Sequence, residues 1–221
     1  YDTSGLSNTA PIARDAQQSL VTDVPQGQYA ATAATDASSY ALMEAFEKGA
    51  IVCFDGHGYD DLRWVRDEGY PRPPEPDLGW VRMADRVVYS MPPPDPPPEG
   101  EGPNVVALVN AQQCHLAVFY TCWAGDDFQA TLPAEGVDCV VGVQNALLYN
   151  GIVSITWFEA FWEDLRQGAT VATALDDAKA AVQALLLQPP PGASEWWNTD
   201  LITATALNHT IVEPEKSGFY K

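Results

Sequence analysis

Basic residues are scarce in this chain of 221 residues: 11 Lys and Arg stand against 30 Asp and Glu, giving a formal net charge of −19. A nucleic-acid partner is therefore not expected, because neutralising phosphates takes a basic face. A solvated acidic surface accounts for such an excess, and so does adaptation to high salt. Attraction of a basic substrate by the negative field is a third interpretation.

Long apolar runs and targeting signals are also lacking. No run of about 18 apolar residues occurs, so the sequence predicts no membrane-spanning helix and a soluble protein. The chain begins at Tyr1, with neither an initiator Met nor a signal peptide. We therefore expect that the original N-terminus is missing, and the sequence leaves the cellular compartment open.

Cysteine is rare and does not occur in metal-binding spacing. The four cysteines form no CxxC pair, so we expect no zinc site and no other resident cofactor. Cys53, Cys122 and Cys139 lie in or beside apolar runs, which is typical of buried free thiols. Cys114 precedes such a run, and we expect it to be partly exposed.

Apolar residues make up 46% of the chain, including seven Trp and seven Phe, enough for one large core. Short apolar runs predict strands at 51–54, within 115–122 and within 137–145, with a last strand near 200–212. Helical periodicity predicts helices within 35–49, 154–168 and 169–188. This alternation indicates an α/β fold with a mostly parallel sheet between two layers of helices.

A proline-rich segment at 67–103 interrupts this pattern. Its two parts, "DEGYPRPPEPDLGW" and "MPPPDPPPEGEGP", flank the short apolar piece "ADRVVYSM". Proline at this density opposes regular structure, so we expect a stiff surface excursion. The sheet pattern resumes directly after it, and 1–221 is therefore predicted to be a single domain.

Two reactive side chains follow predicted strands. In "IVCFDGHGYDDL", His57 lies between Gly56 and Gly58 just past the first strand, and in "HLAVFYTCWAG" Cys122 follows a later one. Strand ends of a parallel sheet meet at one edge, so adjacent strands would bring imidazole and thiol together. A histidine stabilises the thiolate and supplies a proton to the leaving group. Alternatively, His57 merely occupies a turn.

These stretches resemble the caspase-like cysteine peptidases (clan CD), and are most similar to the CHAT-domain branch. "DGHG" and "FYTCWAG" look like the His-Gly and Cys-x-x-Gly elements of that clan, and the order of elements over about residues 31–207 is similar too. The resemblance implies a three-layer α/β/α endopeptidase that acts on a protein or peptide substrate. Cys122 would be the nucleophile and His57 the proton donor, with an oxyanion hole formed by the N–H groups of Gly58 and Cys122.

The substrate pocket is the part of the site where the chain departs from its relatives. Metacaspases carry an acidic residue two positions before the cysteine, where this chain has Tyr120, and Trp123 directly follows the nucleophile. We therefore expect no strong preference for Arg or Lys. Asp126 and Asp127 are further candidates for the pocket, or for calcium, although solvated loop carboxylates are the simpler interpretation.

Two other functions are compatible with the chain. One is a catalytically silent CHAT-like domain that binds a regulatory partner protein. The other, a serine hydrolase, is disfavoured because no GxSxG motif occurs. The remaining histidine near a cysteine, His115, is predicted to sit at the entry to a strand and not to act as a ligand.

Overall fold

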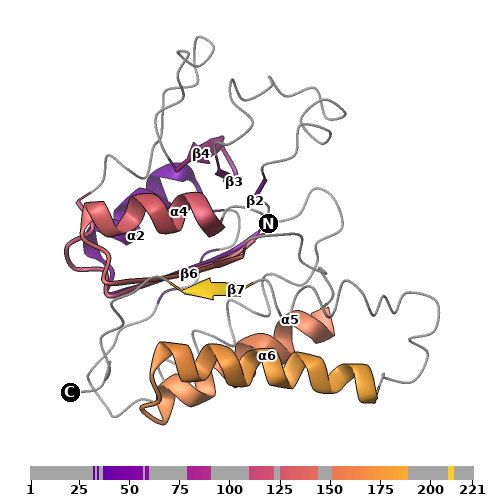
Figure 1. The fold of residues 1–221 in the computed structure, drawn as a ribbon. Coiled ribbons are helices and arrows are strands. Elements are labelled where there is room, and N and C mark those ends of the chain that lie inside the picture. Colours follow the sequence, from indigo (N-terminus) through magenta and orange to yellow (C-terminus); the bar gives the residue numbers. More distant parts are fainter. Residues whose placement is uncertain are drawn as a thin grey trace. The chain divides into compact units, whose positions relative to one another are not determined.

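The computed structural model describes residues 32, 34, 37–56, 58, 59, 79–90, 110–121, 125–143, 151–188 and 209–211 (Figure 1). The chain divides into two compact units, which are described separately. One consists of Asp36–Gln144 with Thr210–Pro214, and the other of Tyr1–Thr35, Asn145–His209 and Glu215–Lys221.

A four-stranded sheet forms the centre of the first unit, in the order β1-β5-β6-β7. The strands are β1 (Ile51–Asp55), β5 (Leu116–Tyr120), β6 (Cys139–Val143) and β7 (His209–Ile211). β5 runs parallel to both β1 and β6. The predicted α/β fold with a mostly parallel sheet is therefore confirmed. Every residue of β5 and β6 is buried, as in parallel sheets that are covered on both faces.

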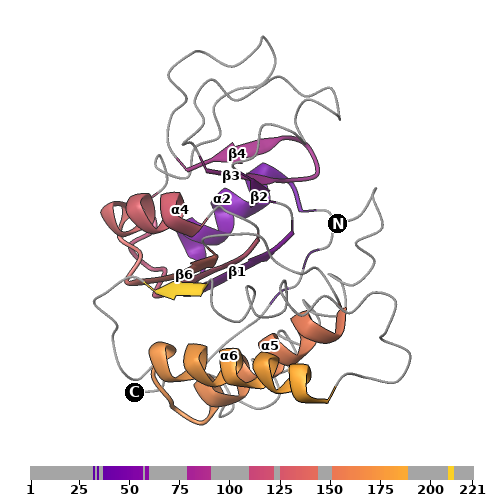
Figure 2. The same cartoon turned by 45° about the vertical axis from the view of Figure 1, so that its right-hand side comes forward.

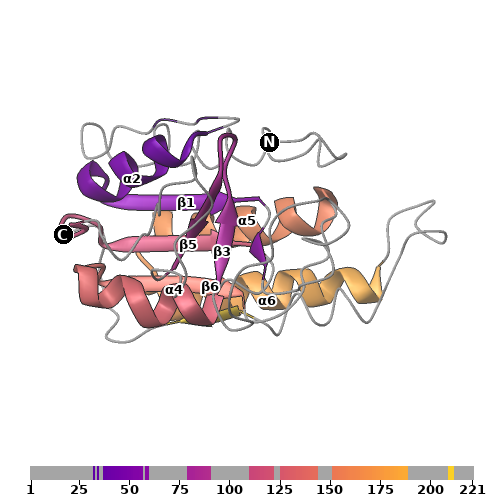
Figure 3. The ribbon, with the colours of Figure 1, turned by 90° about the horizontal axis from the view of Figure 1, so that it is seen from above.

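Two helices lie on one face of this sheet, α2 (Ser39–Lys48) and α4 (Gly125–Thr131), as Figure 3 shows. The predicted helix within 35–49 is confirmed. The Ser38 hydroxyl caps its start by accepting a hydrogen bond from the Ala41 N–H, and Gly49 follows its last turn. Asp126 and Asp127, interpreted from the sequence as loop carboxylates, instead lie in the first turn of α4. This helix continues into a 3₁₀ helix, η2 (Leu132–Glu135).

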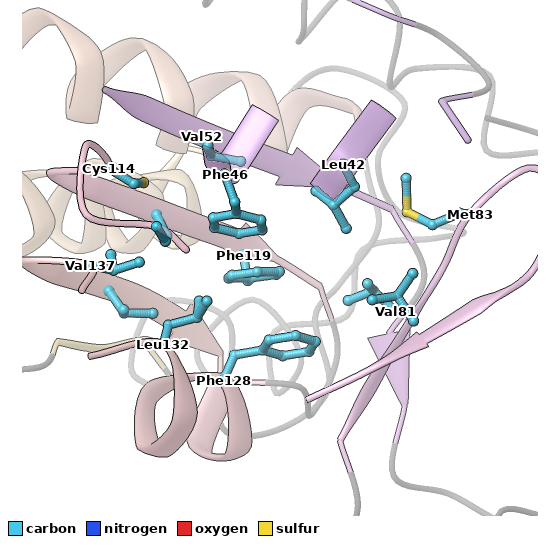
Figure 4. Packing of buried hydrophobic residues seen from close by; sticks show 14 residues of the cluster. Leu42, Phe46, Val52, Val81, Met83, Cys114, Phe119, Phe128, Leu132 and Val137 are labelled. Carbon is cyan, nitrogen blue, oxygen red and sulfur yellow. The ribbon is translucent and has the colours of Figure 1, made fainter. Parts of the chain in front are cut away.

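A column of aromatic rings joins the helices to the sheet (Figure 4). Phe119 of β5 stacks between Phe46 of α2 and Phe128 of α4, with ring centroids 6.1 and 4.3 Å apart, and Phe54 of β1 lies 6.3 Å away. Phe46, Phe119 and Phe128 are almost completely buried. Aromatic pairs at these distances add to the stabilisation from burial alone.

A second sheet has three strands, of which one precedes the predicted proline-rich excursion and two lie within it. β2 (Gly58–Tyr59) pairs antiparallel with β3 (Trp80–Arg82), which pairs antiparallel with β4 (Val87–Tyr89). We refer to residues 79–90 as the β3–β4 hairpin. Its side chains Val81, Met83 and Val88 belong to the same apolar core as the aromatic column (Figure 4). This part of the excursion is therefore packed into the core, whereas the rest of 67–103 lies outside the described residues.

The second unit contains two long helices, α5 (Gly151–Arg166) and α6 (Val171–Leu187), which pack against each other (Figure 2). Both were predicted. Gly168 ends α5 at φ +86°, a conformation that favours glycine, and the Thr170 hydroxyl caps α6 by accepting from the Thr173 N–H. The buried aromatic residues of α5 are Trp157, Phe158, Phe161 and Trp162.

Candidate functional site

The carboxyl ends of β1 and β5 lie next to each other. Asp55 is in register with Tyr120, and the Gly56 N–H donates to the Tyr120 carbonyl oxygen at 3.5 Å. The strands predicted to precede the two reactive residues are thus neighbours in the sheet and run in the same direction. His57 and Cys122 themselves, one and two positions beyond Gly56 and Tyr120 in sequence, lie outside the described residues, as does Trp123.

Gly56 packs closely against the Phe54 ring at the end of β1. A Cβ atom added there would lie 2.9 Å from Cζ of Phe54, closer than real Cβ contacts come. The Phe54 ring also packs on Phe119 of the aromatic column. The backbone that leads to His57 therefore rests on an aromatic side chain, and a larger residue at position 56 would displace it.

The chain after His57 enters the small sheet. Gly58 is in register with Val81 and Tyr59 with Trp80, so antiparallel pairing fixes the backbone on this side as well. Gly58, a predicted oxyanion-hole donor, is buried. His57 thus lies in sequence between two residues that are held by different sheets.

The predicted pocket residues are placed in different ways. Tyr120 is 1% exposed, so its side chain is enclosed by protein. Asp127 of α4 is half-buried and lies directly against the backbone of Gly79. Asp126 belongs to the same helix, and the structure does not describe its side chain. Thr121, the residue before Cys122, is also buried, and its hydroxyl has no hydrogen-bond partner within the described part of the chain.

The three described cysteines are free thiols. Cys139 is buried, as predicted, but Cys53 is exposed, so the prediction of its burial is wrong. Surrounding protein atoms, followed by the Asp55 carboxylate, nevertheless raise the pKa of the Cys53 thiol. Cys114 is fully buried where partial exposure was expected, and desolvation raises its pKa to about 12. Cys53 and Cys114 are therefore not favoured as thiolates near neutral pH.

His115 lies just before β5, at the end of the strand opposite the site, which confirms its position at a strand entry. Its Nδ1 atom is 2.6 Å from Oδ2 of Asp138, so it links the segments that enter β5 and β6. Among the described residues, no group of three or more His, Cys, Asp and Glu side chains is placed to hold a metal ion. Of the helices in these residues, none is long and apolar enough to span a membrane.

The sequence contains a pattern that predicts the β3–β4 hairpin, although the prolines around it led us to expect irregular structure. "WVRM" and "RVVYS" are two short runs that contain Val, Trp and Tyr, and only Ala84 and Asp85 separate them, which is the pattern of a hairpin. The prolines flank these runs and do not interrupt them. The hairpin is the element of the site region that sequence reasoning missed.

Comparison with models of known protein families gives no match to this chain, and comparison with curated protein sequences gives none either.

Proposed function

We propose that the chain is a caspase-like cysteine endopeptidase in which Cys122 and His57 form the catalytic dyad. The observation that carries the proposal is the parallel pairing of β1 and β5 with their carboxyl ends in register. The two residues continue from these neighbouring ends, at the edge where open α/β sheets bind ligands. The burial of Cys114 and Cys139 supports it further, because neither thiol is accessible to a substrate.

The proposed reaction proceeds in two halves. The Cys122 thiolate attacks the scissile carbonyl carbon, and the oxyanion that forms accepts hydrogen bonds from the N–H groups of Gly58 and Cys122. The C–N bond breaks as the His57 imidazolium gives its proton to the leaving amine, which leaves a thioester on Cys122. A water molecule then gives a proton to His57 and attacks the thioester, releasing the acid and regenerating the thiolate.

We propose further that the central sheet is the middle of a three-layer α/β/α sandwich. The core of α2, α4 and the β3–β4 hairpin covers one face of the sheet, where Val52, Ala117 and Phe119 lie. Alternate residues of a strand point to opposite faces, and Val118 and Val141 are buried as well. Burial on both faces is what a second helical layer would produce.

The alternative is a catalytically silent CHAT-like domain that binds a partner protein. The two functions differ in what they require of Cys122, because a binding domain needs no thiolate there. The acidic surface, with a net charge of −19, fits either function.

A peptide-library cleavage assay tests the proposal. We expect hydrolysis by the wild type without strong selection for Arg or Lys, and loss of hydrolysis in both Cys122→Ala and His57→Ala. Cys53→Ala is the matched control and should keep wild-type activity, because Cys53 lies within β1, before the end of the strand that leads to His57. Hydrolysis that survives Cys122→Ala would refute the mechanism, and a chain without hydrolysis that captures a partner protein would favour the binding function.

A further inference from the structure

We propose that the β3–β4 hairpin sets the distance between His57 and Cys122, and that Gly79 is a positioning residue at its contact with α4. The proposal rests on the proposed function. It is drawn from two contacts that one short element makes. The hairpin pairs with the strand that follows His57, and it touches the helix that follows Cys122.

The contact on the His57 side is a backbone pairing. β2 begins at Gly58, the residue after His57, and is held by β3 through the pairs Gly58–Val81 and Tyr59–Trp80. Because the pairing is through the main chain, any shift of β3 shifts β2 with it. The position of the hairpin therefore determines where the chain leaves His57.

The contact on the Cys122 side is unusually close. A Cβ atom added at Gly79 would lie 2.5 Å from Oδ2 of Asp127 and 2.7 Å from its Cβ. Asp127 lies in the first turn of α4, which begins three residues after Cys122. The Asp127 Cβ is fixed to the helix backbone and cannot rotate away. A side chain at position 79 would therefore push the hairpin and α4 apart.

The hairpin is anchored at its turn, so it can transmit such a displacement. The Asp85 carboxylate accepts hydrogen bonds from the Ser39 N–H and hydroxyl, both at 2.7 Å, and the Ala84 N–H donates to the Ala37 carbonyl. At the open end of the hairpin, the Ser90 N–H donates to the Gly79 carbonyl at 2.9 Å. The hairpin is thus fixed to α2 at one end and packed against α4 at the other.

A displacement of about 1 Å between catalytic groups can lower a rate by about 100-fold. For a thiol and an imidazole, the same displacement also weakens the stabilisation of the thiolate and raises the pKa of the cysteine. The hairpin therefore controls two measurable quantities, the turnover rate and the pH at which Cys122 becomes reactive. A purely structural role would change neither in a chain that remains folded.

The test uses the full chain with Gly79→Ala, and Gly49→Ala as the matched control. Gly49 is equally crowded, since a Cβ there would lie 2.6 Å from the Ala45 carbonyl oxygen, but it precedes β1 at the opposite edge of the sheet. The readouts are the thermal midpoint, the hydrolysis rate, and the pH dependence of Cys122 alkylation by iodoacetamide, followed by peptide mass mapping. We expect Gly79→Ala to lower kcat by about 10- to 100-fold and to raise the alkylation midpoint. Gly49→Ala should keep the wild-type kcat and midpoint.

A double variant and a milder one complete the test. Gly79→Ala with Asp127→Gly removes the crowding atom and should return the Cys122 alkylation midpoint to the wild-type value. If Gly79→Ala does not fold, Asp127→Glu replaces it in the test. This substitution adds one flexible methylene at the contact and should shift the alkylation midpoint in the same direction by a smaller amount. A folded Gly79→Ala variant with the wild-type alkylation midpoint and kcat would overturn the inference and leave the proposed function standing. A wild type whose Cys122 has an ordinary midpoint and no hydrolysis would instead overturn the proposed function, and the inference with it.

Discussion

Replacing Asp85 by Ala should release the turn of the β3–β4 hairpin from α2. The carboxylate accepts two hydrogen bonds from Ser39, whose N–H belongs to the first turn of the helix and has no partner within it. Hydrogen bonds to a charged group each contribute about 1.5–3 kcal/mol when buried. The Asp85 side chain is 37% exposed, so solvent screening lowers the expected loss to about 1–2 kcal/mol in total. For a chain of this length, that corresponds to a thermal midpoint lower by about 2–8 °C.

The effect of Asp85→Ala should also depend on pH, with a definite sign. Desolvation acts to raise the pKa of Asp85, but the hydrogen bonds from Ser39 outweigh it and hold the pKa below its ordinary value. The stabilisation is therefore complete above the pKa of an unfolded Asp, about 3.9, and is lost as the pH falls through the lowered folded value. Urea unfolding of wild type and variant at pH 7, 5 and 2 measures this difference.

Asp176→Ala is the control for this measurement. Asp176 is 79% exposed and lies 3.7 Å from Lys179 on the surface of α6, so its removal should cost less than about 0.5 kcal/mol at any of these pH values. Equal unfolding midpoints for wild type and Asp85→Ala at pH 7 would refute the reasoning. A difference that persists unchanged at pH 2 would show that it arises from something other than the carboxylate.

Three further changes test the packing and electrostatics of the two units. Phe119→Ala should lower the free energy of unfolding by about 3–5 kcal/mol in denaturant titrations, because three aromatic rings surround that buried side chain. Gly168→Ala should cost about 1–2 kcal/mol in the same assay, since φ is +86° there, and Gly168→Asn should cost less. Asp164→Asn should stabilise the chain at pH 7, because desolvation and the neighbouring Asp177 raise the pKa of Asp164. Protonation of Asp164 stabilises the wild type as the pH falls through this raised pKa. The free energies of unfolding of wild type and variant should therefore converge towards pH 4.

Local signals explain the elements that the sequence predicts correctly. α2 has a hydroxyl cap at Ser38, buried Leu42 and Phe46 on one face, and Gly49 at its end. The strands β1, β5 and β6 are short apolar runs rich in Val and Phe. β5 and β6 run parallel with α4 and η2 in the crossover between them, as parallel strands require a long connection.

The elements that sequence reasoning misses depend on contacts between distant residues. Trp80 of β3 pairs with Tyr59 and Tyr89, and Asp85 pairs with Ser39, 46 residues earlier in the chain. α4 has only seven residues and begins with Gly and two Asp, so its propensity is weak and burial of Phe128 stabilises it. Cys53 is exposed because it alternates with Val52 on β1, the strand at one end of the sheet order.

Within the site, the sequence predicts the two strands and the edge at which their carboxyl ends lie. The pairing of β1 with β5, and the way the chain beyond them is held, come from the structure. The support of Gly56 by the Phe54 ring and the contact of Gly79 with Asp127 involve side chains with no distinguishing motif. Such contacts depend on the packing of the whole core and become visible only in the folded chain.

The central claim is that Cys122 is a nucleophile activated by His57, and an affinity label tests it most directly. A peptidyl acyloxymethyl ketone should modify Cys122 alone, leaving the exposed Cys53 and the buried Cys114 and Cys139 unmodified in peptide mass maps. The labelling rate should fall sharply in His57→Ala, because loss of the imidazole raises the thiol pKa. Labelling of Cys53 in preference to Cys122, or an equal rate in His57→Ala, would contradict the account.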